Sequence, residues 1–181
     1  MDLGAQVKNN FSIKSMIKNL RIVCFFIALF FTQKVSSQQD NISDDRTFVK
    51  CLIDATGAKV SGDFYLADSL YKKCLKINPK SGVVNFELSG IYLSLNQPQK
   101  ALEYASNAAI IDPGNEWYLA NLALAYKENA NHKKSAETFS KLIEIKPDKI
   151  SYLFSLTEEL LNGNKYKKTL IVLNKIEEKI G

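Results

Sequence analysis

The sequence contains few of the residues on which metal sites depend. It has one histidine, His132, and three cysteines, so a metal centre with several histidine ligands is excluded. His132 lies among Asn131, Lys133 and Lys134, with no cysteine or carboxylate cluster at ligand spacing around it. We interpret it as a structural or solvated residue, and we expect no metal and no cofactor.

Motifs for phosphate binding and covalent catalysis are also missing. Among the eight glycines, Gly57 and Gly62 lie close together but lack the Gly-Lys-Ser/Thr ending of a phosphate loop. No serine or cysteine has the surroundings of a nucleophile elbow. Carboxylate pairs such as Glu158 and Glu159 are expected on solvated helix faces. The sequence therefore favours a protein that is not an enzyme and has no small-molecule substrate.

The positive charge is confined to the beginning of the chain. The formal net charge is +5, but residues 1–37 hold five basic side chains and one acid. Residues 38–181 hold 19 basic and 18 acidic side chains, which is close to balance. An extended basic surface for nucleic acid is therefore not expected.

Residues 1–37 have the organisation of a secretory signal peptide. Basic residues precede an apolar run, Ile22 to Phe31, and small polar residues follow it. This run is well short of the roughly 20 apolar residues that span a bilayer. Cleavage is predicted after Ser37, and Cys24 lies too early in the run for a lipoprotein anchor.

Residues 38–47 are polar and acidic, and they are predicted to be a short tether. Export would place the chain in a bacterial periplasm or outside the cell. The alternatives are an uncleaved N-terminal membrane anchor, the one case in which membrane contact is expected, and a buried core helix.

Three short sequence motifs recur with a fixed period. They are Ile77-Asn78-Pro79, Ile111-Asp112-Pro113 and Ile145-Lys146-Pro147, and their prolines are 34 residues apart. A period of this length is typical of stacked helix–turn–helix units. With proline as position 32, the units are 48–81, 82–115, 116–149 and 150–181.

Each unit has helical periodicity interrupted near its middle. Apolar residues recur three and four apart, which indicates helices. Turn residues interrupt them at 61–63, 96–98, 129–131 and 163–165. Pro98 is suited to the first turn of the second helix of its unit.

The chain resembles the tetratricopeptide repeat family over about residues 48–181. Small residues occupy the positions where the family's paired helices approach closely. At position 8 these are Ala55, Ser89, Ala123 and Thr157, and at position 20 they are Ala67, Ala101, Ser135 and Thr169. Bulky residues occupy positions 7, 11 and 24 in most units, including Leu88, Tyr92 and Leu173. The first unit departs from the pattern, with Asp54 at position 7 and Ala58 at position 11.

The resemblance implies an all-α, right-handed solenoid of antiparallel helix pairs with about four units. In this family the first helices line a concave groove through positions 2, 5, 9 and 12. The partner-binding residues this implies are Leu52, Phe86, Leu93, Trp117, Leu124, Lys127, Phe154 and Leu161. Some members clamp a terminal carboxylate with several basic residues; here Lys59 and Lys127 are the candidates, so such a clamp is not expected.

The same register places Cys51 and Cys74 side by side in antiparallel helices. Export would favour a disulfide between them. Two buried thiols packing as small apolar groups, or a redox-active pair, remain alternatives.

The last helix carries more apolar residues than one buried stripe needs, including Leu170 and Ile171. It is either an apolar end helix or a docking end for a partner or a second copy.

Two functions follow from these observations. The first is an exported scaffold that binds a peptide or partner helix in the groove. The second is a structural or assembly subunit of a bacterial envelope complex that docks through its terminal helices.

Overall fold

The computed structural model describes residues 45–181, and in that range the chain is helical, with no strand. Residues 45–60 form the first helix. The helices that follow are α2 (Phe64–Ile77), α3 (Gly82–Ser94), α4 (Pro98–Ile111), α5 (Glu116–Glu128), α6 (His132–Ile145), α7 (Ile150–Asn162) and α8 (Tyr166–Ile180). The predicted signal peptide and most of the tether lie outside the described residues.

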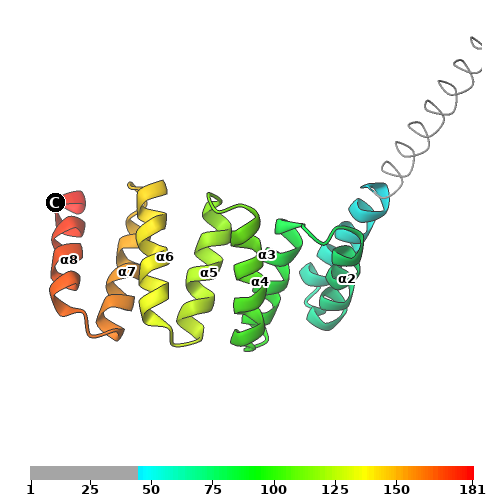
Figure 1. The fold of residues 1–181 in the computed structure, drawn as a ribbon, viewed down its shortest axis with the longest axis horizontal. Coiled ribbons are helices and arrows are strands. Elements are labelled where there is room, and N and C mark those ends of the chain that lie inside the picture. Colours follow the sequence, from blue (N-terminus) through cyan, green and yellow to red (C-terminus); the bar gives the residue numbers. More distant parts are fainter. Residues whose placement is uncertain (1–44) are drawn as a thin grey trace, which may run out of the picture. The chain divides into compact units, whose positions relative to one another are not determined.

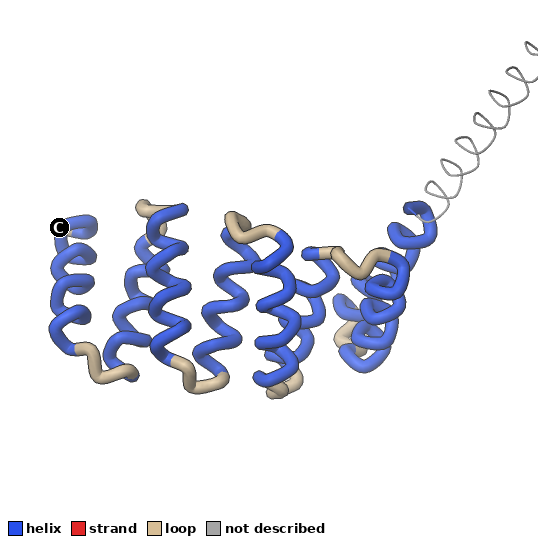
Figure 2. Tube along the Cα trace, in the orientation of Figure 1, coloured by secondary structure: helices blue, strands red, loops and turns tan. Residues whose placement is uncertain are grey.

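Residues 48–181 form one compact unit. From α2 to α8 the helices follow one another in a row, each next to the helix that precedes it in the sequence (Figures 1 and 2). The chain is an all-α solenoid, as predicted. Within residues 45–181, no helix has the length and apolar character needed to cross a bilayer.

Local signals in the sequence set where the helices begin. Side chains of Asp63, Ser81, Asn115 and Asn131 accept hydrogen bonds from the first free backbone N–H groups of α2, α3, α5 and α6. Pro98 lies at the start of α4, as predicted, where a missing N–H costs little.

The turn inside each helix pair uses one left-handed residue. Gly62, Asn96, Ala130 and Asn164 have φ angles of 82°, 53°, 55° and 56°. All four occupy position 15 of their units. Glycine and asparagine tolerate this conformation, whereas alanine has a Cβ atom that opposes it. Ala130 is therefore the strained member of the set.

The two helices of a pair meet at small residues. Every residue at positions 8 and 20 is buried. In the second unit Ser89 Oγ donates a hydrogen bond to the carbonyl oxygen of Ala101, at 2.8 Å. In the third unit Ser135 Oγ donates to the carbonyl oxygen of Ala123, at 2.9 Å. Small side chains let the backbones approach, and a serine hydroxyl can then bridge the helices.

Bulky residues at position 24 fill space between neighbouring units at the first and third units but not at the last one. At position 24, Tyr71 and Phe139 are buried, but Leu173 is 42% exposed. Leu173 therefore does not contribute to the core in the way that its counterparts in the first and third units do. The buried residues of α8 are Thr169, Val172 and Ile176, which lie on the side of the helix that packs on α7. Among the described helices, none covers the side that carries Leu173.

Candidate functional site

The candidate site is a row of side chains on the first helices of the four units. We call these residues the first-helix face; they are Leu52, Phe86, Leu93, Trp117, Leu124, Lys127, Phe154 and Leu161. Trp117 is 64% exposed, and Leu124, Phe154 and Leu161 are also exposed. Leu52, Phe86, Leu93 and Lys127 are half-buried. None of the eight belongs to the fully buried core, so all remain able to contact a partner.

A cluster of polar side chains lies next to Trp117. Lys149 Nζ lies 5.3 Å from the centre of the indole ring and donates a hydrogen bond to Glu116 Oε1, at 2.6 Å. Tyr152 donates its hydroxyl hydrogen to the same oxygen, at 2.7 Å. A cation over an aromatic ring is attracted to it, so Lys149 holds one face of the indole while the rest stays exposed.

The charges in this cluster stabilise one another. The hydrogen bond from Lys149, followed by that from Tyr152, holds the pKa of Glu116 below its usual value. The same bond to Glu116 raises the pKa of Lys149. Both groups are therefore charged at neutral pH, and the cation stays next to Trp117.

The lysines of the predicted groove are already paired. Lys127 Nζ donates to Glu158 Oε1, at 2.7 Å, and Lys59 is paired with Glu87. Each pair joins the first helices of consecutive units. A lysine neutralised in this way is a poor receptor for the carboxylate of a ligand, so the face is mainly apolar.

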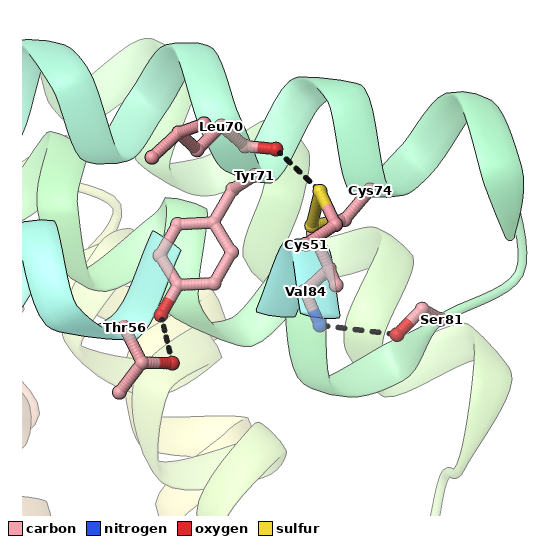
Figure 3. The surroundings of a disulfide bond; sticks show 7 residues. All are labelled: Cys51, Thr56, Leu70, Tyr71, Cys74, Ser81 and Val84. Atoms are coloured by element: carbon pink, nitrogen blue, oxygen red, sulfur yellow. Dashed lines mark hydrogen bonds between the residues drawn. A yellow bond between two sulfur atoms is a disulfide. The ribbon is translucent and has the colours of Figure 1, made fainter. Parts of the chain in front are cut away.

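A disulfide joins Cys51 in the first helix to Cys74 in α2, with 5.7 Å between the Cα atoms (Figure 3). Next to it, the buried Tyr71 ring reaches back to the first helix, where its hydroxyl oxygen lies 3.1 Å from Thr56 Oγ1 (Figure 3). The bridge thus ties together the two helices of the first unit, in which Asp54 and Ala58 replace larger apolar residues.

The burial of Glu159 differs from the prediction. The sequence predicts that Glu158 and Glu159 are both solvated, but Glu159 is fully buried. Its Oε2 lies 3.1 Å from Nδ1 of His132, and its Oε1 has no hydrogen-bond partner. Glu159 faces the start of α6, where His132 offers a polar partner. The single histidine is therefore a structural residue that joins α6 to α7.

One pocket of about 490 Å³ adjoins this pair. It is lined by α6, α7 and α8, and Leu156, Leu160, Ile171 and Val172 provide its apolar surface. It lies apart from the eight residues of the first-helix face. Around the described residues, no group of three or more histidine, cysteine or acidic side chains could hold a metal ion.

Sequence reasoning missed the partners of Trp117 and of His132. Glu116 and Lys149 lie 33 residues apart, at the first and last positions of the third unit. Opposite charges at that spacing are a signal that could have identified the pair.

Comparison with known proteins supports the repeat assignment. Residues 118–149 match the family described as Tetratricopeptide repeat. The chain is 33% identical over 130 residues to human Sperm-associated antigen 1, which covers 70% of this chain. The chain spans only 14% of the length of that protein.

Solved structures share the fold. MamA from Desulfovibrio magneticus superimposes with a TM-score of 0.63 and 21% identity, over 69% of this chain and 71% of its own. The first tetratricopeptide repeat domain of Spaghetti (RPAP3), solved with an HSP90 peptide, has a TM-score of 0.59 and 12% identity. That match covers 62% of this chain and 89% of the domain.

The fold and the repeat pattern define a helical-repeat protein. The chain resembles the tetratricopeptide repeat family, whose model matches residues 118–149 and whose solved members share its fold.

Proposed function

We propose that this chain is an exported, non-enzymatic scaffold that binds an apolar helix or extended peptide along the first-helix face. The observation that carries the proposal is Trp117, a tryptophan that remains 64% exposed while Lys149 holds one side of its ring. Large exposed apolar side chains in one row often mark an interaction site. Tryptophan is also enriched among the residues that dominate binding energy.

The chemistry of the face favours an apolar partner over an acidic one. Trp117, Leu124, Phe154 and Leu161 supply exposed apolar area, whereas Lys59 and Lys127 are paired with glutamates. The Spaghetti (RPAP3) domain was solved with a peptide, which supports a peptide partner for the same fold. Binding would bury the apolar side chains of the partner against this row.

Selection from a displayed peptide library tests the binding site. Peptides selected on the full chain are expected to be rich in apolar residues, and Trp117→Ala is expected to weaken their binding by about 30-fold. Because Trp117 is the single tryptophan of the chain, its fluorescence should shift to shorter wavelength as a peptide covers it.

Ile110→Ala is the matched control for this experiment. Ile110 is a highly exposed apolar residue on α4, a second helix, and its removal should leave binding unchanged. Equal binding by Trp117→Ala and the wild type would refute the proposed site. Selected peptides that depend on Ile110 instead would refute it too.

Export is the second part of the proposal. It is supported by the order of basic, apolar and small polar residues in 1–37 and by the Cys51–Cys74 bridge, since disulfides persist in oxidising compartments. When the full chain is produced in a bacterium, the mature protein is expected outside the cytoplasm and to begin at Gln38. An intact N-terminus in the membrane fraction would instead indicate an anchor.

A structural role is the alternative function. It would use the ends of the solenoid rather than the first-helix face, and the exposed apolar residues of α8 favour it.

A further inference from the structure

The last helix carries a regular stripe of side chains, apolar except for Glu177, that no described helix covers. We call Tyr166, Leu170, Leu173, Glu177 and Ile180 the α8 stripe. Its members are four, three, four and three residues apart, and all are exposed. A period of 3.5 residues places side chains along one line of a helix, which is the pattern of a helix–helix seam. The α8 stripe therefore has the geometry of an interface with another helix.

The equivalent positions in the preceding unit show what this surface does inside the solenoid. Ala136 and Phe139 of α6 correspond to Leu170 and Leu173, and both are buried where α7 packs on α6. Phe139 is 3% exposed and Leu173 is 42% exposed. The α8 stripe is thus a packing surface for a helix, and its apolar residues lie in solvent in the single chain.

The first helix of another copy fits this surface poorly. In a head-to-tail stack, that helix would take the place that α7 occupies against α6. Position 7 of its unit is Asp54, which is exposed and makes no ion pair within residues 45–181. At the same position α3 and α7 carry the buried leucines Leu88 and Leu156. Burial of an unpaired carboxylate against leucines is costly, so head-to-tail stacking is disfavoured.

A second α8 in antiparallel orientation fits the surface well. Lys167 flanks the stripe near its beginning, whereas Glu177 and Glu178 lie near its end. None of the three makes an ion pair within the described chain. Antiparallel packing of two copies would bring Lys167 of each helix next to the acidic end of the other, while the leucines meet in the middle.

We propose that two copies of this chain pair through the α8 stripe, with the two helices antiparallel and related by a two-fold axis. Such an interface uses the same patch on both copies and closes at two. It lies on α8 and leaves the first-helix face of each copy available, so dimerisation and peptide binding are independent properties.

Sedimentation equilibrium of the full chain over a wide range of concentrations tests the proposal. The wild type should approach twice the mass of one chain as concentration rises. Leu173→Glu should weaken dimerisation at least about tenfold, because each copy would place a further charge at the apolar centre of the seam. Leu173 is already partly exposed, so the variant should keep its helix content, which circular dichroism checks.

Ile171→Glu is the matched control. Ile171 lies on the same helix and is 58% exposed, but it faces the pocket next to α6 and α7 rather than the stripe. This variant should dimerise like the wild type. Loss of the dimer in Ile171→Glu with its retention in Leu173→Glu would overturn the proposed seam.

A charge exchange tests the antiparallel orientation. Lys167→Glu should weaken the dimer, and adding Glu177→Lys and Glu178→Lys to it should restore most of the affinity. In a parallel pair Lys167 would not meet this acidic end, and the exchange would fail to rescue. A mass that stays at one chain, or that grows beyond two, would overturn the proposal as a whole.

Discussion

At the scale of single residues, the turn inside each helix pair depends on one backbone conformation. Gly62, Asn96 and Asn164 suit the left-handed region, and Ala130 does not. The equivalent residues of the other three units have the same left-handed backbone, so the position in the repeat sets this conformation and not the residue type. The structure around Ala130 therefore imposes a φ of 55° on a side chain that resists it.

Ala130→Gly is expected to stabilise the protein. Removal of the Cβ atom relieves strain of about 1–2 kcal/mol in the folded state. The greater conformational freedom of glycine in the unfolded chain offsets part of this gain in stability. The free energy of unfolding should rise by about 0.5–1 kcal/mol, measured by urea denaturation. Ala120→Gly, in the interior of α5, is the control and should lower it by about 1 kcal/mol. A lower stability in Ala130→Gly would contradict the strain argument.

At the scale of helices, each pair is held by close approach at small residues, and the first pair has an additional covalent link. Buried alanine, serine or threonine residues at positions 8 and 20 bring the helices together in every unit. In the first unit the apolar contribution is smaller, since Asp54 at position 7 is exposed and position 11 holds the small side chain of Ala58. The Cys51–Cys74 bridge offsets this deficit because it restricts the conformations that the unfolded chain can adopt.

Reduction of this bridge is expected to destabilise the first helix pair. The loop between the cysteines spans 23 residues, and closing a loop of this size restricts the unfolded state by about 3 kcal/mol. Urea denaturation with and without reductant measures the loss, and intact mass should rise by two hydrogens per bridge. The Cys51→Ser, Cys74→Ser double variant should start at the lower stability and not respond to reductant. Equal stability of the oxidised and reduced proteins would contradict this prediction.

At the scale of the whole molecule, stability in stacked repeats comes from contacts between neighbours. The helices α3 to α6 have neighbours before and after them in the row, whereas α8 packs on α7 at the end of the row (Figure 1). The α8 stripe is exposed to solvent. The end of the array should therefore open more readily than its centre.

Hydrogen exchange of the Leu173→Glu variant tests this expectation without interference from dimers. Among α2 to α8, amides of α8 should exchange fastest, and those of α3 to α6 should exchange slowest. In the wild type at high concentration, α8 should become more protected. Uniform exchange along the chain would show that the array unfolds as one cooperative unit.

Much of the fold could be predicted from the sequence, because it follows from local patterns. The prolines Pro79, Pro113 and Pro147 set the period, and helix caps and turn residues set the ends of the helices. The candidate site is less local. Trp117 could be assigned to the first-helix face from its position in the unit, but its contact with Lys149, at the other end of the same unit, depends on how the helices fold back on one another.

The sequence by itself determined the repeat period, the helix pairs and the small residues at which they meet. These properties arise from spacing along the chain and from the conformational preferences of single residues. Only the tertiary structure decided that Glu159 is buried next to His132 and that Leu173 is exposed. The physical reason is that burial depends on which neighbouring helix covers a side chain. The repeat pattern is the same at the centre and at the end of the array, but the neighbours are not.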